Sequence, residues 1–307
     1  MNIRKLSPEL TKTAQENLGE RPDHLLDDIE ALRSWINKQP HLISRDDDQF
    51  IVTFLRFCKF SLEESKRRLE AYLTCKTFYP ELFRVRPVDS NVLDIVRSGF
   101  TCTLPNPHPT NGSRICITQF AQFDPQKFKL RDMFKVNFMQ FELLAFEDDV
   151  AGVNGIEQVI DLKNCTFQQT LHVNPIDLRK VSTYHEKCVP FRIHRVHVIN
   201  FRRELQGIYR VAVGFVPSGV PFEILLHEKE EDLFNYIPQE SLNDDYGGSN
   251  GKKTDLIEEL VKSFQDHEEY FQKDEILGTN EKLRREPYLN LQTDFGVEGS
   301  FRKLEVD

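Results

Sequence analysis

Long apolar runs are absent from this sequence of 307 residues. The longest spans about seven residues, whereas a membrane-spanning helix needs roughly 20. The first residues are polar and lack the apolar segment of a secretory signal peptide. The six cysteines are scattered without a Cys-x-x-Cys pair, which disfavours a zinc site or a disulfide framework and favours a reducing compartment. We therefore expect a soluble protein of the cytoplasm.

Positive charge is also scarce, because 40 Lys and Arg residues stand against 49 Asp and Glu residues, for a net charge of −9. Nucleic-acid binding requires a basic surface, so nucleic acid is not an expected partner. Residues 192–210 reverse the balance, with five arginines, two histidines and a single acid. Such a cluster suits the anionic headgroups of a membrane. The alternative is that these arginines pair with the acids at residues 228–232.

Catalytic and metal-binding motifs are missing as well. No Gly-x-Ser-x-Gly, Gly-x-Gly-x-x-Gly or His-Glu-x-x-His pattern occurs. His194 and His197 lie on a predicted strand at a spacing that points them to opposite faces, so they are not expected to share a metal. Residues 46–48 lack the glycine and the later glutamate of a calcium loop and are expected to cap a helix. We expect neither an enzyme nor a resident cofactor or metal.

The N-terminal part of the chain is helical in pattern. Residues 1–22 are polar and are expected to form a flexible arm. Residues 23–85 carry apolar side chains at helical spacing in successive segments, which predicts an all-helical domain. One of its helices is expected over residues 47–57, and Ser61 with Glu64 forms a capping-box pattern that opens the next.

Residues 86–255 alternate between strand and helix patterns. Strand patterns occupy residues 114–120, 156–162, 195–201 and 223–227. A long helix is expected over residues 130–146, and another is expected to begin at Asn174. This alternation predicts an α/β domain with a largely parallel sheet. Residues 256–307 are expected to form a C-terminal helix and tail.

Phenylalanine is abundant, with 24 residues against a single tryptophan. Phe134, Phe138 and Phe141 form a stripe at helical spacing, and such a stripe either fills a core or lines an apolar cavity. Residues 205–221 form an apolar helical face bounded by glycine and proline, which suits a mobile cover over a cavity. The alternative for this segment is a turn that leads into the strand at residues 223–227.

Short motifs occur in a fixed order along the chain. They are Phe-Leu-Arg-Phe-Cys-Lys-Phe at 54–60, Ile-Asp-Leu at 160–162, Val-Pro-Phe-Arg at 189–192, His-Val-Ile-Asn at 197–200 and Asp-Tyr-Gly-Gly at 245–248. On these motifs the chain resembles the CRAL-TRIO family, in particular its cellular retinaldehyde-binding and α-tocopherol transfer protein subgroup, and the first motif is similar to that of insect members. The resemblance implies an N-terminal helical domain and a lipid-binding domain. In the latter, a mostly parallel sheet floors an apolar cavity beneath a helical gate.

The resemblance also implies which residues meet the ligand. They lie on the long helix, on two strands, on the helix between those strands and on the gate: Phe134, Asn137, Phe138, Phe141, Ile156, Val159, Ile160, Tyr184, Ile199, Leu205, Ile208, Tyr209, Ala212, Phe215 and Val216. It implies a phosphoinositide or membrane role for Lys59, Arg192, His194 and Arg195. Three further positions that are basic in the tocopherol transfer proteins hold Cys58, Gly219 and Glu223 here.

The function that these features indicate is that of a carrier. It would hold one small hydrophobic ligand, such as a retinoid, tocopherol, carotenoid or similar lipid, in an internal cavity and transfer it to or from membranes. We expect a monomer that touches membranes transiently and peripherally, with phosphoinositide as a partner through the basic residues. The alternative is a regulatory module that docks on phosphoinositide or on a protein without carrying lipid.

Overall fold

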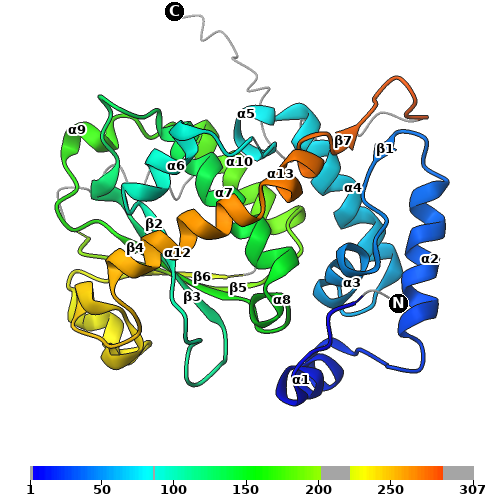
Figure 1. Cartoon of the computed structure of the whole chain (residues 1–307), viewed down its shortest axis with the longest axis horizontal. Coiled ribbons are helices and arrows are strands. Elements are labelled where there is room, and N and C mark those ends of the chain that lie inside the picture. The colour runs from blue at the N-terminus through cyan, green and yellow to red at the C-terminus, as the bar shows by residue number, and fades with distance from the viewer. Residues whose placement is uncertain (1–2, 86, 202–221, 286–307) are drawn as a thin grey trace, which may run out of the picture.

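The computed structural model describes residues 3–85, 87–201 and 222–285. Figure 1 shows two regions side by side, with helices α1 to α4 in one and a five-stranded sheet with its covering helices in the other. This arrangement confirms the predicted fold class, a helical N-terminal part followed by an α/β domain.

The N-terminal region is built from α1 (Pro8–Leu18), α2 (Leu25–Asn37), α3 (Asp48–Phe57) and α4 (Leu62–Phe78). Asp47 caps α3, because its side chain accepts a hydrogen bond from the Phe50 amide at 3.0 Å. Ser61 precedes α4 without making a side-chain cap, so the predicted capping box does not form. The apolar faces of α2, α3 and α4 pack into one core that also receives Phe146 from the α/β domain.

The α/β domain is built on a sheet with the strand order β2-β3-β4-β5-β6. The strands are β2 (Thr101–Thr103), β3 (Arg114–Gln119), β4 (Ile156–Asp161), β5 (Ile193–Ile199) and β6 (Glu223–Leu226). β3 to β6 run parallel, and β2 pairs with β3 in the antiparallel sense. The mostly parallel sheet is therefore confirmed, although the short strand β2 was not predicted.

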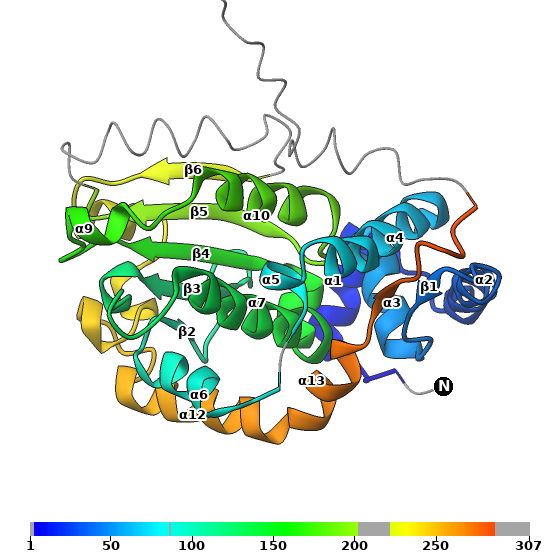
Figure 2. The ribbon, with the colours of Figure 1, turned by 90° about the horizontal axis from the view of Figure 1, so that it is seen from above.

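Helices cover one face of this sheet. The helices of this part of the chain are α5 (Pro80–Phe83), α6 (Ser90–Arg97), α7 (Leu130–Glu147), α8 (Asp149–Asn154), α9 (Phe167–Thr170), α10 (Pro175–Lys187), α12 (Lys253–Asp266) and α13 (Glu268–Glu275). α7 and α10 lie above the strands in Figure 1 and in front of them in Figure 2. The opposite face is closed by the 3-10 helix η3 (Glu230–Asn235) and the residues after it, which bury Leu233, Ile237 and Leu242.

The expected flexible arm over residues 1–22 is instead a packed segment over its described part. Ala14 and Leu18 of α1 are buried against Val153 of α8. Arg4 holds the segment further through salt bridges to acids at the end of α7 and the start of α8, at 2.8 and 3.1 Å. α1 contains few apolar residues and buries only Ala14 and Leu18, so its mostly polar sequence concealed the helix.

Motifs that are far apart in the sequence meet at Asp161, the last residue of β4. Its carboxylate accepts hydrogen bonds from Asn200 Nδ2 at 2.7 Å and from the Tyr246 hydroxyl at 2.9 Å. A side-chain carbon on Gly248 would lie 2.0 Å from the carbonyl oxygen of Leu242, so only glycine fits there. These residues hold the carboxyl end of β4 to the segment that closes the far face of the sheet.

The two regions are joined by buried contacts. The Arg68 guanidinium of α4 donates to the carbonyl oxygens of Val189 at 3.0 Å and Glu186 at 2.7 Å. β1 (Leu42–Ile43) pairs with β7 (Gly278–Thr279), so the last described residues return to the helical region, beside α4 in Figure 1.

Candidate functional site

A cavity of about 330 Å³ lies between the sheet and the helices α7 and α10. Its apolar lining comes from both helices and from the sheet, and includes Phe134, Phe138, Phe141, Ile160, Leu178, Val181, Val196 and Val198. None of the described lining residues is Lys, Arg, Asp or Glu. The described wall is therefore uncharged and mostly apolar, which suits an oily ligand.

The alternation of side chains along a strand decides which strand residues reach this cavity. On β4, Gln158 and Ile160 line it, whereas Val159 between them points to the opposite face. On β5, Val196 and Val198 line it in the same way. Each central strand therefore contributes one face to the cavity and the other to a filled core.

Some of the ligand-binding residues expected from the sequence line this cavity: Phe134, Asn137, Phe138, Phe141 and Ile160. The first four lie on α7 at relative positions i, i+3, i+4 and i+7, so the helix turns them toward the sheet together. Asn137 adds a polar group to this stripe, and its Oδ1 accepts a hydrogen bond from the Thr101 hydroxyl at 3.0 Å.

Other expected strand residues do not line the cavity. Val159 and Ile199 pack on the far face of the sheet, in the core that contains Leu233 and Ile237. Each directly follows a residue that lines the cavity, Gln158 on β4 and Val198 on β5, so its side chain points away from α7 and α10. Ile156 is fully buried in the core at the start of β4.

Tyr184 was also expected to meet the ligand, but it faces the helical region instead. Its ring stacks on Phe83 with the centroids 4.0 Å apart, and its hydroxyl donates to Glu142 at 3.3 Å. The next residue on α10, His185, lines the cavity. Neighbouring residues of a helix point about 100° apart, and this rotation separates the two side chains.

The residues expected to form the gate lie outside the described residues of the structure: Leu205, Ile208, Tyr209, Ala212, Phe215 and Val216.

Several polar residues of the cavity were not anticipated from the sequence. Gln158, Ser182 and His185 line it, together with Thr118 and Thr170. Ser182 and His185 follow Leu178 by four and seven residues, so the helical spacing of α10 already contained the signal for both. Gln158 had a similar signal, because it precedes Ile160 by two residues and therefore points to the same face of the strand.

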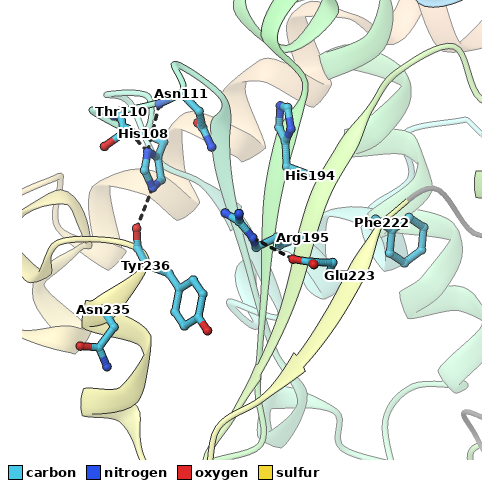
Figure 3. Close-up of a pocket in the computed structure, with 9 residues that line it drawn as sticks. All are labelled: His108, Thr110, Asn111, His194, Arg195, Phe222, Glu223, Asn235 and Tyr236. Atoms are coloured by element: carbon cyan, nitrogen blue, oxygen red, sulfur yellow. Dashed lines mark hydrogen bonds and ion pairs between the residues drawn. The ribbon is translucent and has the colours of Figure 1, made fainter.

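A second cleft, of about 820 Å³, lies at the amino ends of β5 and β6 and is polar. Figure 3 shows Arg195 in the middle of this cleft, with its ion pair to Glu223 drawn as a dashed line. Arg195 pairs with Glu223 at 3.2 Å and with Glu157 at 3.5 Å. His194 Nε2 lies 2.5 Å from the carbonyl oxygen of Asn154. The basic groups of this cleft are therefore already engaged with protein partners.

The residues expected to bind headgroups are not all found in this cleft. Arg192 points inward, where its guanidinium donates to the carbonyl oxygen of Val153 and burial lowers its pKa. Lys59 is exposed in the turn between α3 and α4. The alternative prediction, that the arginine cluster pairs with the acids at residues 228–232, does not hold for Arg195, which pairs with Glu157 and Glu223. The arginines at positions 202, 203 and 210 lie outside the described part of the chain.

Two negative findings apply to the described residues. No group of three or more His, Cys, Asp or Glu side chains among them is arranged to hold a metal ion. In the same part of the chain, no helix combines the length and the apolar character that are required to span a bilayer.

Comparison with known proteins places the cavity within a family domain. The model of the Pinta-like UBA domain matches residues 21–93, and the model of the CRAL/TRIO domain matches residues 98–248. The second range contains every described residue that lines the cavity. The chain belongs to the CRAL/TRIO family. Proteins of the CRAL/TRIO family bind and transfer lipids, and this chain shares that general function.

Individual relatives agree with this assignment. The human protein "Alpha-tocopherol transfer protein-like" is 29% identical over 250 residues, which cover 80% of this chain and 72% of that protein. Human "Clavesin-2" is 29% identical over 246 residues, covering 79% of this chain and 75% of that protein. The solved structure "Crystal structure of Sfh5" matches with a TM-score of 0.46 and 12% identity over 87% of this chain and 99% of that chain. The two sequence relatives support membership of the CRAL/TRIO family, and the structural match is too distant to add to it.

Proposed function

We propose that this CRAL/TRIO protein is a carrier that holds one small hydrophobic ligand, of the retinoid, tocopherol or carotenoid kind, and transfers it to or from membranes. The observation that supports this is the cavity of about 330 Å³ beside α7 and α10, with no charged residue in its described lining. In a filled core, Phe134, Phe138 and Phe141 would meet only other side chains. Here they border empty space of the size and character that hydrophobic ligands occupy.

The ligand-binding residues that we propose are those that border this space: Phe134, Asn137, Phe138, Phe141 and Ile160. Burial of about 400 Å² of ligand surface would contribute on the order of 10 kcal/mol at 25 cal/mol per Å², before the entropy lost on binding is subtracted. A gain of this size is enough to retain a lipid against water. Release therefore requires a membrane that offers the ligand an equally apolar environment.

We further propose that a monomer delivers the ligand from the cytoplasm by transient, peripheral contact with membranes. Lys59 and Arg195 are candidates for attraction to anionic headgroups, including phosphoinositide, because both reach the surface. Arg192 is a poor candidate, because it is half-buried and its guanidinium donates to the backbone.

Extraction of the purified protein with organic solvent, followed by mass spectrometry, tests the carrier function. We expect one lipid species in a ratio close to one per chain. The protein should then move that lipid between donor and acceptor vesicles at a rate that rises with protein concentration. A chain that yields no lipid and takes up none from a panel of retinoids, tocopherols and carotenoids would refute the proposal.

Vesicle sedimentation separates this function from that of a docking module. A carrier should bind vesicles weakly, and replacement of Arg195 by Glu should slow transfer without preventing lipid uptake. Strong binding that depends on phosphoinositide, in a protein that takes up no lipid, would favour the docking module instead.

A further inference from the structure

Two residues that line the cavity carry a buried polar atom with no hydrogen-bond partner, namely His185 at Nδ1 and Gln158 at Oε1. A buried polar atom left unpaired costs about 1–3 kcal/mol, so folded proteins keep few of them. Thr170 of the same lining is paired, because its hydroxyl donates to the Phe167 carbonyl oxygen at 2.6 Å. The described chain therefore supplies no partner to one polar atom on each of two residues that line the cavity.

His185 lies in an aromatic setting. Its ring centroid is 5.6 Å from that of Phe138, 5.8 Å from Phe141 and 6.0 Å from Phe191. Burial, with no compensating acid, lowers the pKa of His185 to about 4. The imidazole is thus uncharged near neutral pH, with one nitrogen able to donate a hydrogen bond and the other able to accept one.

The orientation of the Gln158 amide is fixed by its neighbours. Its Nε2 donates to the Val159 carbonyl oxygen at 3.1 Å and to the Thr118 hydroxyl at 3.0 Å. A carbonyl oxygen can only accept, so the amide nitrogen must occupy this position. Oε1 is consequently an acceptor to which no described residue donates.

The polar cleft shown in Figure 3 lacks this feature. Arg195 already pairs with Glu223 and Glu157, and His108 Nε2 lies 2.9 Å from the carbonyl oxygen of Tyr236. Unpaired polar atoms on lining residues distinguish the apolar cavity from this cleft.

We propose that His185 anchors the polar end of the ligand and selects a lipid whose polar group is an uncharged hydroxyl. The inference rests on the proposed carrier function. A hydroxyl both donates and accepts, so it can pair with either nitrogen of a neutral imidazole. An ether or ester oxygen can only accept. A carboxylate would bring a charge into a cavity whose described lining offers no cation, which is costly.

The test compares pairs of probes in which the hydroxyl proton of one member is replaced by a methyl group in the other. Retinol, α-tocopherol and 1-octadecanol are each measured against their own methyl ether, by equilibrium binding to the full chain. Four proteins are used: wild type, His185→Leu, His185→Asn and the control Leu178→Ala, which shortens an apolar lining residue on the same helix. In the wild type we expect the alcohol that fits best to bind about tenfold more tightly than its ether, the value of one hydrogen bond.

The variants should separate anchoring from packing. His185→Leu should bring the alcohol-to-ether ratio close to one, mainly by weakening the alcohol, and His185→Asn should restore part of it. Leu178→Ala should weaken both members of a pair and leave their ratio unchanged. Thermal denaturation verifies folding, and if His185→Leu is unfolded, His185→Asn against wild type supplies the comparison.

The possible failures are distinguishable. If the wild type binds none of the six probes and yields no lipid on extraction, the carrier function itself is contradicted, and the anchor with it. If it binds none of the probes but carries another lipid, the carrier function stands and the preference for a hydroxyl is wrong. If the wild type binds alcohols and ethers equally, or keeps its preference for alcohols after His185 is replaced, the carrier function stands and His185 is not the anchor.

Discussion

Burial acts in opposite ways on two ionisable side chains of this protein, because only one of them has partners. Burial alone would lower the pKa of the Lys76 ammonium, but the carboxylates of Asp274 and Glu142 outweigh it and raise the pKa. His185 has no such partner, so burial lowers its pKa to about 4. Lys76 is therefore a cation held inside the protein, and His185 is a neutral polar group beside the cavity.

The pKa of His185 predicts a dependence of stability on acid. Between its ordinary value of 6.5 and about 4, the unfolded chain binds a proton that the folded chain does not, so stability falls as the pH falls through this window. The substitution His185→Leu removes the titrating group and therefore this loss of stability at low pH. We expect the decrease in the free energy of unfolding between pH 7 and pH 4.5 to be smaller in the variant by about 2 kcal/mol.

Urea denaturation at the two pH values measures this difference. Leu178→Ala serves as the control, because it changes the same helix without removing a titrating group, and its destabilisation should be equal at both pH values. An identical pH dependence in wild type and His185→Leu would show that His185 is not held neutral by burial.

At the scale of single elements, the central strands lie between the cavity on one face of the sheet and a packed core on the other. The side chains of β4 alternate between the cavity, reached by Ile160, and a filled core on the far face, reached by Val159. α10 makes a similar division by rotation, since His185 lines the cavity while Tyr184 packs toward the helical region. Of two adjacent residues in one strand or helix, therefore, one lines the cavity and the other packs against the rest of the protein.

This division predicts opposite results for one substitution at adjacent positions. Ile160→Trp should place the larger side chain in the cavity, so lipid uptake should fall sharply while the melting temperature changes little. Val159→Trp must enter a close-packed core, which costs about 1–3 kcal/mol or more through overpacking. Lipid bound per chain and melting temperature are measured for both. Equal destabilisation by the two substitutions would show that the space beside Ile160 is not available in solution.

At the scale of the whole molecule, a buried charged cluster ties together three distant segments. Lys76 of α4 contacts Glu142 of α7 at 3.1 Å and forms a salt bridge with Asp274 of α13. The Tyr72 hydroxyl donates to Glu142 at 2.6 Å. The helical region, the α/β domain and the C-terminal helix thus meet in one cluster, and we expect them to unfold together.

Removal of the central cation tests this connection. Lys76→Met should destabilise the protein by about 3–5 kcal/mol, because it leaves two buried carboxylates without their cation. Lys273→Met is the matched control, since Lys273 is 70% exposed and pairs with Glu269 on the same helix at 2.7 Å. The control should cost less than about 0.5 kcal/mol. Denaturation curves that shift equally in the two variants would contradict a structural role for the cluster.

Sequence reasoning was most successful where an element is long and its pattern repeats. The spacing along residues 130–146 predicted α7 and its phenylalanine face, and alternation predicted β3 and β4 close to their observed bounds. The short strands β1, β2 and β7 were missed, because two or three residues cannot display a period and form only beside a distant partner. α1 was missed because it buries few apolar side chains.

The sequence by itself determined the class of this protein. Its helical and strand periodicities and its ordered motifs are local properties, and they were enough for the fold class and the CRAL/TRIO family. The tertiary structure alone decided which side chains border the cavity. In the structure, Val159, Ile199 and Tyr184 lie away from the cavity, whereas His185 and Gln158 line it. The physical reason is that a cavity is the space left between packed elements, and the register of each strand and the rotation of each helix against its neighbours depend on the whole fold.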